Sequence, residues 1–174
     1  MKIFILCLFF FLPGCQTAFS QDTIHWKKDF KLRWEDFKGI PDSSSEHKAM
    51  TMAEIWSTLT YTETFYEIKI HCVFHKNESW SVSTEQILLS HEQGHFDIAE
   101  LFTRKMRMAF KEYIFNPKTI NKDYSAIFSK ITRERAKMDD LYDKETDYSL
   151  NSSIQQSWNK KILDEIKKLD AYDK

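Results

Sequence analysis

Two histidines and a glutamate near the middle of the chain have types and spacing suited to metal chemistry. Residues 91–95 read His-Glu-Gln-Gly-His, so the two histidines stand four positions apart. On a helix, positions i and i+4 share one face, with Cβ atoms about 5–6 Å apart. Two imidazoles so placed can bind one zinc ion at about 2.0–2.1 Å. We therefore predict His91 and His95 as metal ligands and Zn2+ as the cofactor.

The glutamate between them has a different expected role. Glu92 is one step around the helix from His91, where it cannot easily bind the metal but can reach a water molecule on it. A bound metal lowers the pKa of its water from 15.7 toward about 7 and polarises a carbonyl group. Glu92 would then act as the general base of peptide hydrolysis. The alternative is a helix with two ordinary, partly buried histidines and a surface Glu92.

The motif requires a helix to present it. Apolar residues and the two histidines recur at spacings of three and four from Ile87 to Tyr113, which predicts one stripe of a long helix. Ser83 and Gln86 have the spacing of a capping box at its start. Asn116 precedes a proline, so the helix should end there.

The rest of the chain predicts strands before this helix and helices after it. Residues 66–75 alternate apolar and polar side chains, 52–61 form a preceding strand, and 62–64 form the hairpin loop. Residues 32–34 are a further short strand. A second helix runs through 124–141, a polar segment covers 143–151, and a third helix starts at 152. We predict an α+β fold in which N-terminal antiparallel strands pack on a C-terminal bundle of about three helices, with a zincin-like helix at 91–95.

The third metal ligand is not part of the motif. Glu100 follows His91 by nine residues and, at about 100° per residue, points to the opposite side of the helix. Asp97 can orient a neighbouring group or be a surface charge. The remaining histidines are expected to be solvated or lack a partner at suitable spacing; they are His25, His47, His71 and His75.

The segment from Leu88 to Glu100 resembles the signature helix of a bacterial family of predicted secreted zinc-dependent proteases. The resemblance extends to residues 32–39, 79–80, 142–146 and 156–158, and so covers nearly the whole chain after residue 20. It implies a secreted or envelope metallopeptidase that acts on a peptide or protein substrate.

The chain departs from the family at one position. In the family a Thr-x-His-Gly segment follows the Tyr-Asp pair, and its histidine is the natural third ligand. Here Tyr148 stands at that position. Tyr148 can bind the metal as a phenolate, Asp147 or less readily Glu145 can supply a carboxylate, or metal binding is weak and catalysis is lost. We predict Asp147 or Tyr148 as the third ligand.

The first twenty residues predict export. Lys2 precedes a ten-residue apolar run that is too short to span a membrane, and Ala18 and Ser20 form a small-x-small cleavage site. Residues 1–20 are therefore a predicted signal peptide, and 21–174 form a single domain that is secreted or periplasmic. The alternative is a lipoprotein anchored at Cys15, because residues 12–15 resemble a lipobox. No transmembrane span is expected after cleavage.

Composition excludes several classes of protein. The chain has 174 residues, 42% hydrophobic and 29% charged, with a net charge of −1, which excludes a disordered chain and gives no reason to expect nucleic acid as a partner. Two functions other than a peptidase stay open: an inactive envelope or lipoprotein binding module on the same fold, and assembly through the third helix. A helical stripe is more often intramolecular core, so we expect a monomer.

Overall fold

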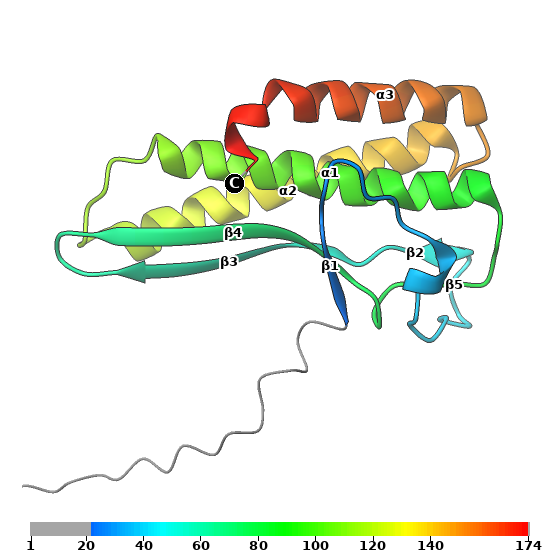
Figure 1. Ribbon diagram of the computed structural model, residues 1–174, viewed down its shortest axis with the longest axis horizontal. Coiled ribbons are helices and arrows are strands. Elements are labelled where there is room, and N and C mark those ends of the chain that lie inside the picture. Colours follow the sequence, from blue (N-terminus) through cyan, green and yellow to red (C-terminus); the bar gives the residue numbers. More distant parts are fainter. Residues whose placement is uncertain (1–21, 174) are drawn as a thin grey trace, which may run out of the picture.

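The computed structural model describes residues 22–173 and contains short antiparallel strands followed by three helices (Figure 1). The predicted α+β fold is confirmed. The predicted signal peptide, its cleavage site and the Cys15 anchor lie outside the described residues. The elements in chain order are β1 (Thr23–His25), β2 (Ala49–Met50), β3 (Ala53–Tyr61), β4 (Tyr66–His75), β5 (Trp80–Ser81), α1 (Gln86–Lys111), α2 (Ile120–Thr146) and α3 (Ser152–Lys168), with 3-10 turns at Trp34–Asp36 and Asp170–Tyr172.

The main sheet has the order β1-β4-β3, and all its pairs are antiparallel. The predicted hairpin is confirmed: β3 and β4 pair in register from Ala53 opposite Phe74 to Tyr61 opposite Tyr66. Alternation places Ile55, Ile70 and Phe74 on the buried face, where they meet the helices. A second, two-stranded sheet pairs β2 with β5.

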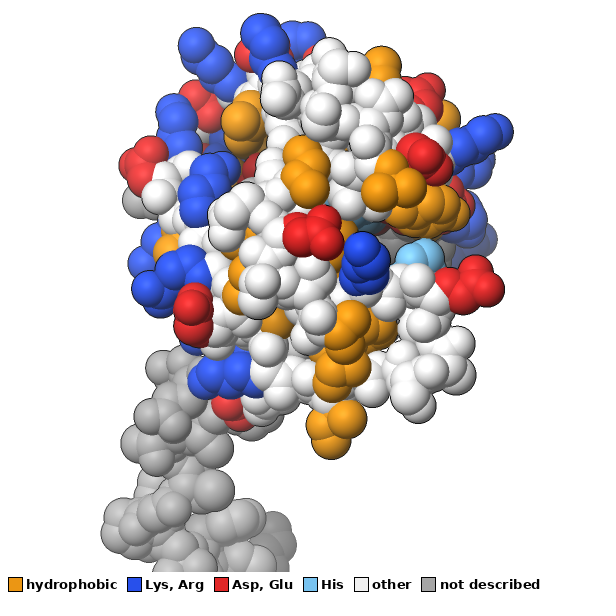
Figure 2. Space-filling model, turned by 90° about the vertical axis from the view of Figure 1, so that its right-hand side faces the viewer, with side chains coloured by type: hydrophobic (Ala, Val, Ile, Leu, Met, Phe, Trp, Pro, Cys, Tyr) orange, Lys and Arg blue, Asp and Glu red, His pale blue; other side chains and the backbone are white. Residues whose placement is uncertain are grey.

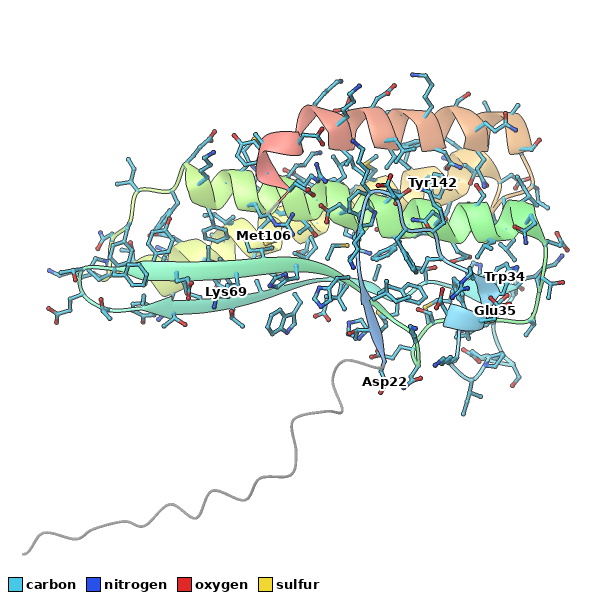
Figure 3. The ribbon with its side chains drawn as sticks, viewed as in Figure 1. Asp22, Trp34, Glu35, Lys69, Met106 and Tyr142 are labelled. Carbon is cyan, nitrogen blue, oxygen red and sulfur yellow. The ribbon has the colours of Figure 1, made fainter. Side chains whose placement is uncertain are left out.

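The elements form three layers. The sheet lies on one side, α1 and α2 lie in the middle, and α3 covers α1 on the far side (Figure 1). Met106 of α1 is fully buried between helix and sheet, and Tyr142 of α2 is fully buried among the helices (Figure 3). Helix α1 contacts the sheet, α2 and α3, so its His-Glu-Gln-Gly-His motif is held from several directions.

Three local predictions were wrong. Residues 32–34 form no strand, because the Asp36 carboxylate accepts a hydrogen bond from Arg33 N at 3.0 Å and closes a 3-10 turn. Helix α1 begins only at Gln86, because the Ser83 hydroxyl accepts from the Glu85 amide at 3.2 Å rather than from inside the helix. The helix also ends at Lys111, before the Asn-Pro pair.

Helix α2 is longer than the sequence indicated, and this change affects the site. It continues to Thr146, so the polar segment predicted between the last two helices begins as helix. Leu141, the last residue of the predicted second helix, is 44% exposed, and its neighbour Tyr142 is buried. The extension places Asp143 on the face of α2 that packs against α1.

Helices of the described part, residues 22–173, are all too short or too polar to cross a membrane.

Candidate metal centre

Helices α1 and α2 bring two histidines and an aspartate to one point. The Asp143 Oδ1 atom lies 3.0 Å from His91 Nε2 and 2.9 Å from His95 Nε2. The two Nε2 atoms are 3.3 Å apart. Two nitrogens bound to zinc at about 2.0–2.1 Å with a tetrahedral angle would also be about 3.3 Å apart. The three residues form a group that can hold a metal ion.

The structure places the residues predicted as third ligands elsewhere. Asp147 is the exposed, left-handed C-cap of α2 and is not part of the His-His-Asp group. Tyr148 is 53% exposed on the rim of the same hollow, with its ring 5.5 Å from that of His47. The Glu145 carboxylate accepts from the indole of Trp158 at 2.7 Å. The carboxylate that reaches the histidines is Asp143, which the sequence reasoning missed.

The turn that follows Asp143 has an unusual backbone. Asp147, Tyr148 and Ser149 have φ values of 49°, 49° and 79°, a left-handed region that costs non-glycine residues energy. The Tyr148 amide donates to the Asp143 carbonyl at 3.0 Å. The turn therefore ends α2 at Thr146, three residues after the aspartate, and holds Tyr148 beside the group.

The cationic form of His95 and the anionic form of Asp143 stabilise each other. Burial opposes protonation of His95, but its hydrogen bonds to Asp139 and Asp143 outweigh burial and raise its pKa to about 10. Burial also acts against the Asp143 anion, but hydrogen bonds from His91 and His95 hold the Asp143 pKa well below its usual range. An imidazole must be unprotonated to bind a metal, so metal binding here displaces a proton.

Both imidazole rings are fixed on the side away from Asp143. The His91 ring stacks on Tyr142 with centroids 4.6 Å apart and planes at 11°. Its Nδ1 atom lies 3.4 Å from the Thr146 hydroxyl. The Nδ1 atom of His95 lies 2.9 Å from Asp139 Oδ1. The Nε2 atoms are thus the ones directed at the shared point.

Glu92 lies beside the group and is 3% exposed. Glu92 lines a hollow of about 620 Å³ together with the His-His-Asp group, and its carboxylate makes no hydrogen bond or ion pair within residues 22–173. A buried carboxylate without such a partner can take a proton from a nearby water.

Figure 2 views the end of the molecule where α2 turns into α3, and hydrophobic, acidic and basic side chains are mixed across it.

The remaining polar residue of the motif ties α1 to the N-terminal segment. The Gln93 side chain accepts from Leu32 N and donates to Asp97, both at 2.8 Å. Asp97 also accepts from Trp26 at 2.8 Å and is only 6% exposed, so its reading as a surface charge was wrong. These bonds fix the helix at the level of the motif.

Gly94 is required by the close approach of Tyr142. A Cβ atom at Gly94 would lie 2.6 Å from Tyr142 Cζ and still closer to its hydroxyl oxygen. Tyr142 is fully buried and cannot move aside. Alanine favours helices by about 1 kcal/mol over glycine, but a clash of this kind in a packed core costs about 1–3 kcal/mol or more.

We expect Gly94→Ala to lower the free energy of unfolding by about 2 kcal/mol, because the clash outweighs the helix propensity. Urea unfolding of both proteins measures the difference. Ser129→Ala, on the exposed face of α2, is the control and should be nearly neutral. Equal stability of Gly94→Ala and wild type would contradict the packing described above.

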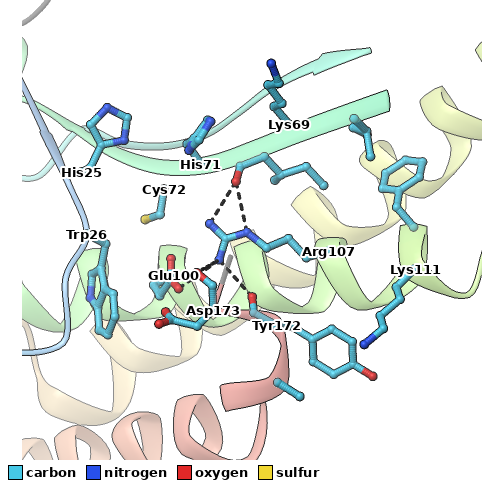
Figure 4. Close-up of a pocket in the computed structure, with 14 residues that line it drawn as sticks. His25, Trp26, Lys69, His71, Cys72, Glu100, Arg107, Lys111, Tyr172 and Asp173 are labelled. Carbon is cyan, nitrogen blue, oxygen red and sulfur yellow. Dashed lines mark hydrogen bonds and ion pairs between the residues drawn. The ribbon is translucent and has the colours of Figure 1, made fainter. Parts of the chain in front are cut away.

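A second hollow, of about 610 Å³, lies between β4, α1 and the C-terminal turn (Figure 4). The arginine that lines it, Arg107, is already paired. Arg107 donates to the Ile70 carbonyl at 2.9 Å and to the Tyr172 and Asp173 carbonyls at 3.1 Å, and it lies 3.4 Å from Glu100. These bonds attach the C-terminal turn to the sheet and the helix. They also hold Glu100 in an ion-pair network, apart from the histidine pair.

Compared with known proteins, the chain matches no protein-family model, no curated protein and no solved structure, so the argument for function rests on the site itself.

Proposed function

We propose that this protein is a zinc-dependent metallopeptidase with a zincin-like helix α1. The observation that carries the proposal is the His-His-Asp group beside the buried Glu92 carboxylate in one hollow. Two imidazoles and one carboxylate are a donor set typical of catalytic zinc sites, which keep a position open for water. The spacing of the Nε2 atoms of His91 and His95 also suits zinc.

The proposed roles follow from the positions of the side chains. His91, His95 and Asp143 would hold the ion, which when bound supplies a polarised water molecule and a Lewis acid for the peptide carbonyl. Glu92 would take the proton of the attacking water and pass it to the leaving amine. Burial of Glu92 keeps bulk water from competing for that proton.

An extended segment beside the hollow supports a peptide as the substrate. Residues 46–51 all line the hollow, and β2 within them pairs with β5 along one edge. Thr51 also anchors to α1, through a hydrogen bond from its hydroxyl to the Glu92 carbonyl at 3.4 Å. The unpaired edge of a short strand can bind an extended peptide through backbone hydrogen bonds. We therefore propose a peptide or protein chain as substrate. From the predicted signal peptide at residues 1–20 we also propose a secreted or periplasmic location.

A binding module without catalysis is the second candidate. The hydrogen bonds among His91, His95, Asp139 and Asp143 form a complete network in the structure. Such a network can stabilise the packing of α1 on α2 without any metal. This candidate predicts an unchanged melting temperature when zinc is added.

Metal removal tests the proposal. Purified protein should cleave an unfolded, fluorescently labelled protein such as casein, lose the activity after dialysis against a chelator, and regain it with about one equivalent of zinc. Zinc should also raise the melting temperature of the chelator-treated protein, because it binds only the folded state. Activity that survives complete removal of metal would overturn the proposal.

A further inference from the structure

We infer that Asp139 is a positioning residue that orients His95 for metal binding, with Arg135 holding Asp139 against the sheet; this inference rests on the proposed metal site. Asp139 lies one turn before Asp143 on α2, as His95 lies one turn after His91 on α1. The two i, i+4 pairs face each other across the helix contact. Asp143 meets the Nε2 side of the histidines, and Asp139 meets the Nδ1 side of His95.

The contacts form a continuous chain from the sheet to the ligand. Arg135 donates through Nη1 to the Ala53 carbonyl of β3 at 2.7 Å, and its Nε lies 3.2 Å from Asp139 Oδ2. The other oxygen of Asp139 lies 2.9 Å from His95 Nδ1. The Asp139 and Arg135 side chains are only 20% and 18% exposed, so solvent weakens the pair less than it would on the open surface. The carboxylate therefore has one oxygen for the arginine and one for the histidine.

This arrangement suits the form of His95 that would bind a metal. Asp143 and Asp139 each lie 2.9 Å from a ring nitrogen of His95, Asp143 at Nε2 and Asp139 at Nδ1. Once a metal takes the place of the Nε2 proton, the Asp139 oxygen holds the remaining proton on Nδ1, and the Nε2 lone pair faces the metal. The same contact prevents the ring from turning about its Cβ–Cγ bond.

His91 is held differently, which makes the role of Asp139 specific to one ligand. Within residues 22–173 its Nδ1 atom meets only the neutral Thr146 hydroxyl, at 3.4 Å, and its ring is fixed by stacking on Tyr142. His95 meets Tyr142 edge-on, at 5.2 Å and 84°, which constrains its rotation less. The charged partner is thus present at the ligand that packing holds less firmly.

The test compares Asp139→Asn with Asp140→Asn, because Asp140 is the exposed neighbour on the same turn of α2. Zinc affinity is measured by competition with a chromogenic chelator, and geometry by the visible absorption of the cobalt-substituted proteins. We expect Asp139→Asn to weaken zinc binding by about 10–100-fold and to change the cobalt spectrum. Asp140→Asn should match wild type in both. Arg135→Gln should weaken zinc binding in the same direction by a smaller factor, because Asp139 loses its anchor.

Thermal unfolding of the metal-free variants separates positioning from simple support of the fold. A lower melting temperature for Asp139→Asn with unchanged zinc affinity and cobalt spectrum would overturn the inference while leaving the metal site intact. If Asp139→Asn fails to fold, Arg135→Gln alone decides between these results. Wild-type protein that binds neither zinc nor cobalt would overturn both the inference and the proposed function.

Discussion

Glu92→Gln is expected to lower kcat/KM for peptide hydrolysis by about 10²–10⁴-fold while the protein keeps its zinc. The range is that typical of a positioned general base. Glutamine has nearly the same shape as glutamate but cannot accept a proton at neutral pH. Glu92 is outside the His-His-Asp group, so metal content should not change. The measurement is steady-state cleavage of a labelled peptide together with zinc analysis of the same samples.

The control for this variant is Glu85→Gln. Glu85 also lines the hollow, but it is exposed at the start of α1 and lies 3.5 Å from Lys48. Its substitution removes the same charge from the same hollow without touching the proposed base, so activity should stay close to wild type. Equal losses in the two variants would mean that the overall charge of the hollow, rather than proton transfer by Glu92, supports cleavage.

Asp143→Ala is expected to abolish zinc binding at micromolar zinc. Asp143 Oδ1 is within 3.0 Å of both Nε2 atoms, so its loss removes one of the three proposed protein ligands. The fall in affinity should exceed the approximately 10–100-fold typical of losing a partner outside the ligand set. Calorimetric titration of the metal-free protein with zinc measures it.

Asp147→Ala and Tyr148→Phe are the matched variants for this prediction, because the sequence pointed to these two residues. Asp147 is a helix C-cap, and Tyr148 stands on the rim of the hollow. Both variants should bind one zinc with affinity close to wild type. Loss of zinc in either one, with retention in Asp143→Ala, would show that the turn moves to supply the ligand.

Much of the fold could be read from the sequence because the signals were local. Period-two alternation predicted β4, a segment rich in threonine, isoleucine and tryptophan predicted β3, and a helical stripe predicted α1 with both histidines on one face. The ends of elements were less predictable. Ser83 had the right neighbours for a capping box, but its hydroxyl bonds to Glu85 in a turn before the helix.

The third ligand could not be found in the same way because it depends on the packing of one helix against another. Residues 143–151 are polar, and the structure continues α2 into this segment because Tyr142 and Thr146 are buried against α1. One sequence signal did exist. Asp139 and Asp143 repeat the i, i+4 spacing of the two histidines, and two such pairs on facing helices can meet. The family resemblance drew attention to Tyr148 instead, five residues later.

The most direct measurement is a crystal structure of the zinc-loaded protein with anomalous diffraction recorded on both sides of the zinc absorption edge. A single strong peak is expected at about 2.0–2.2 Å from His91 Nε2, His95 Nε2 and an Asp143 oxygen, with Glu92 outside the ligand set. A protein that crystallises without zinc at this point, or that holds it at other residues, would contradict the account.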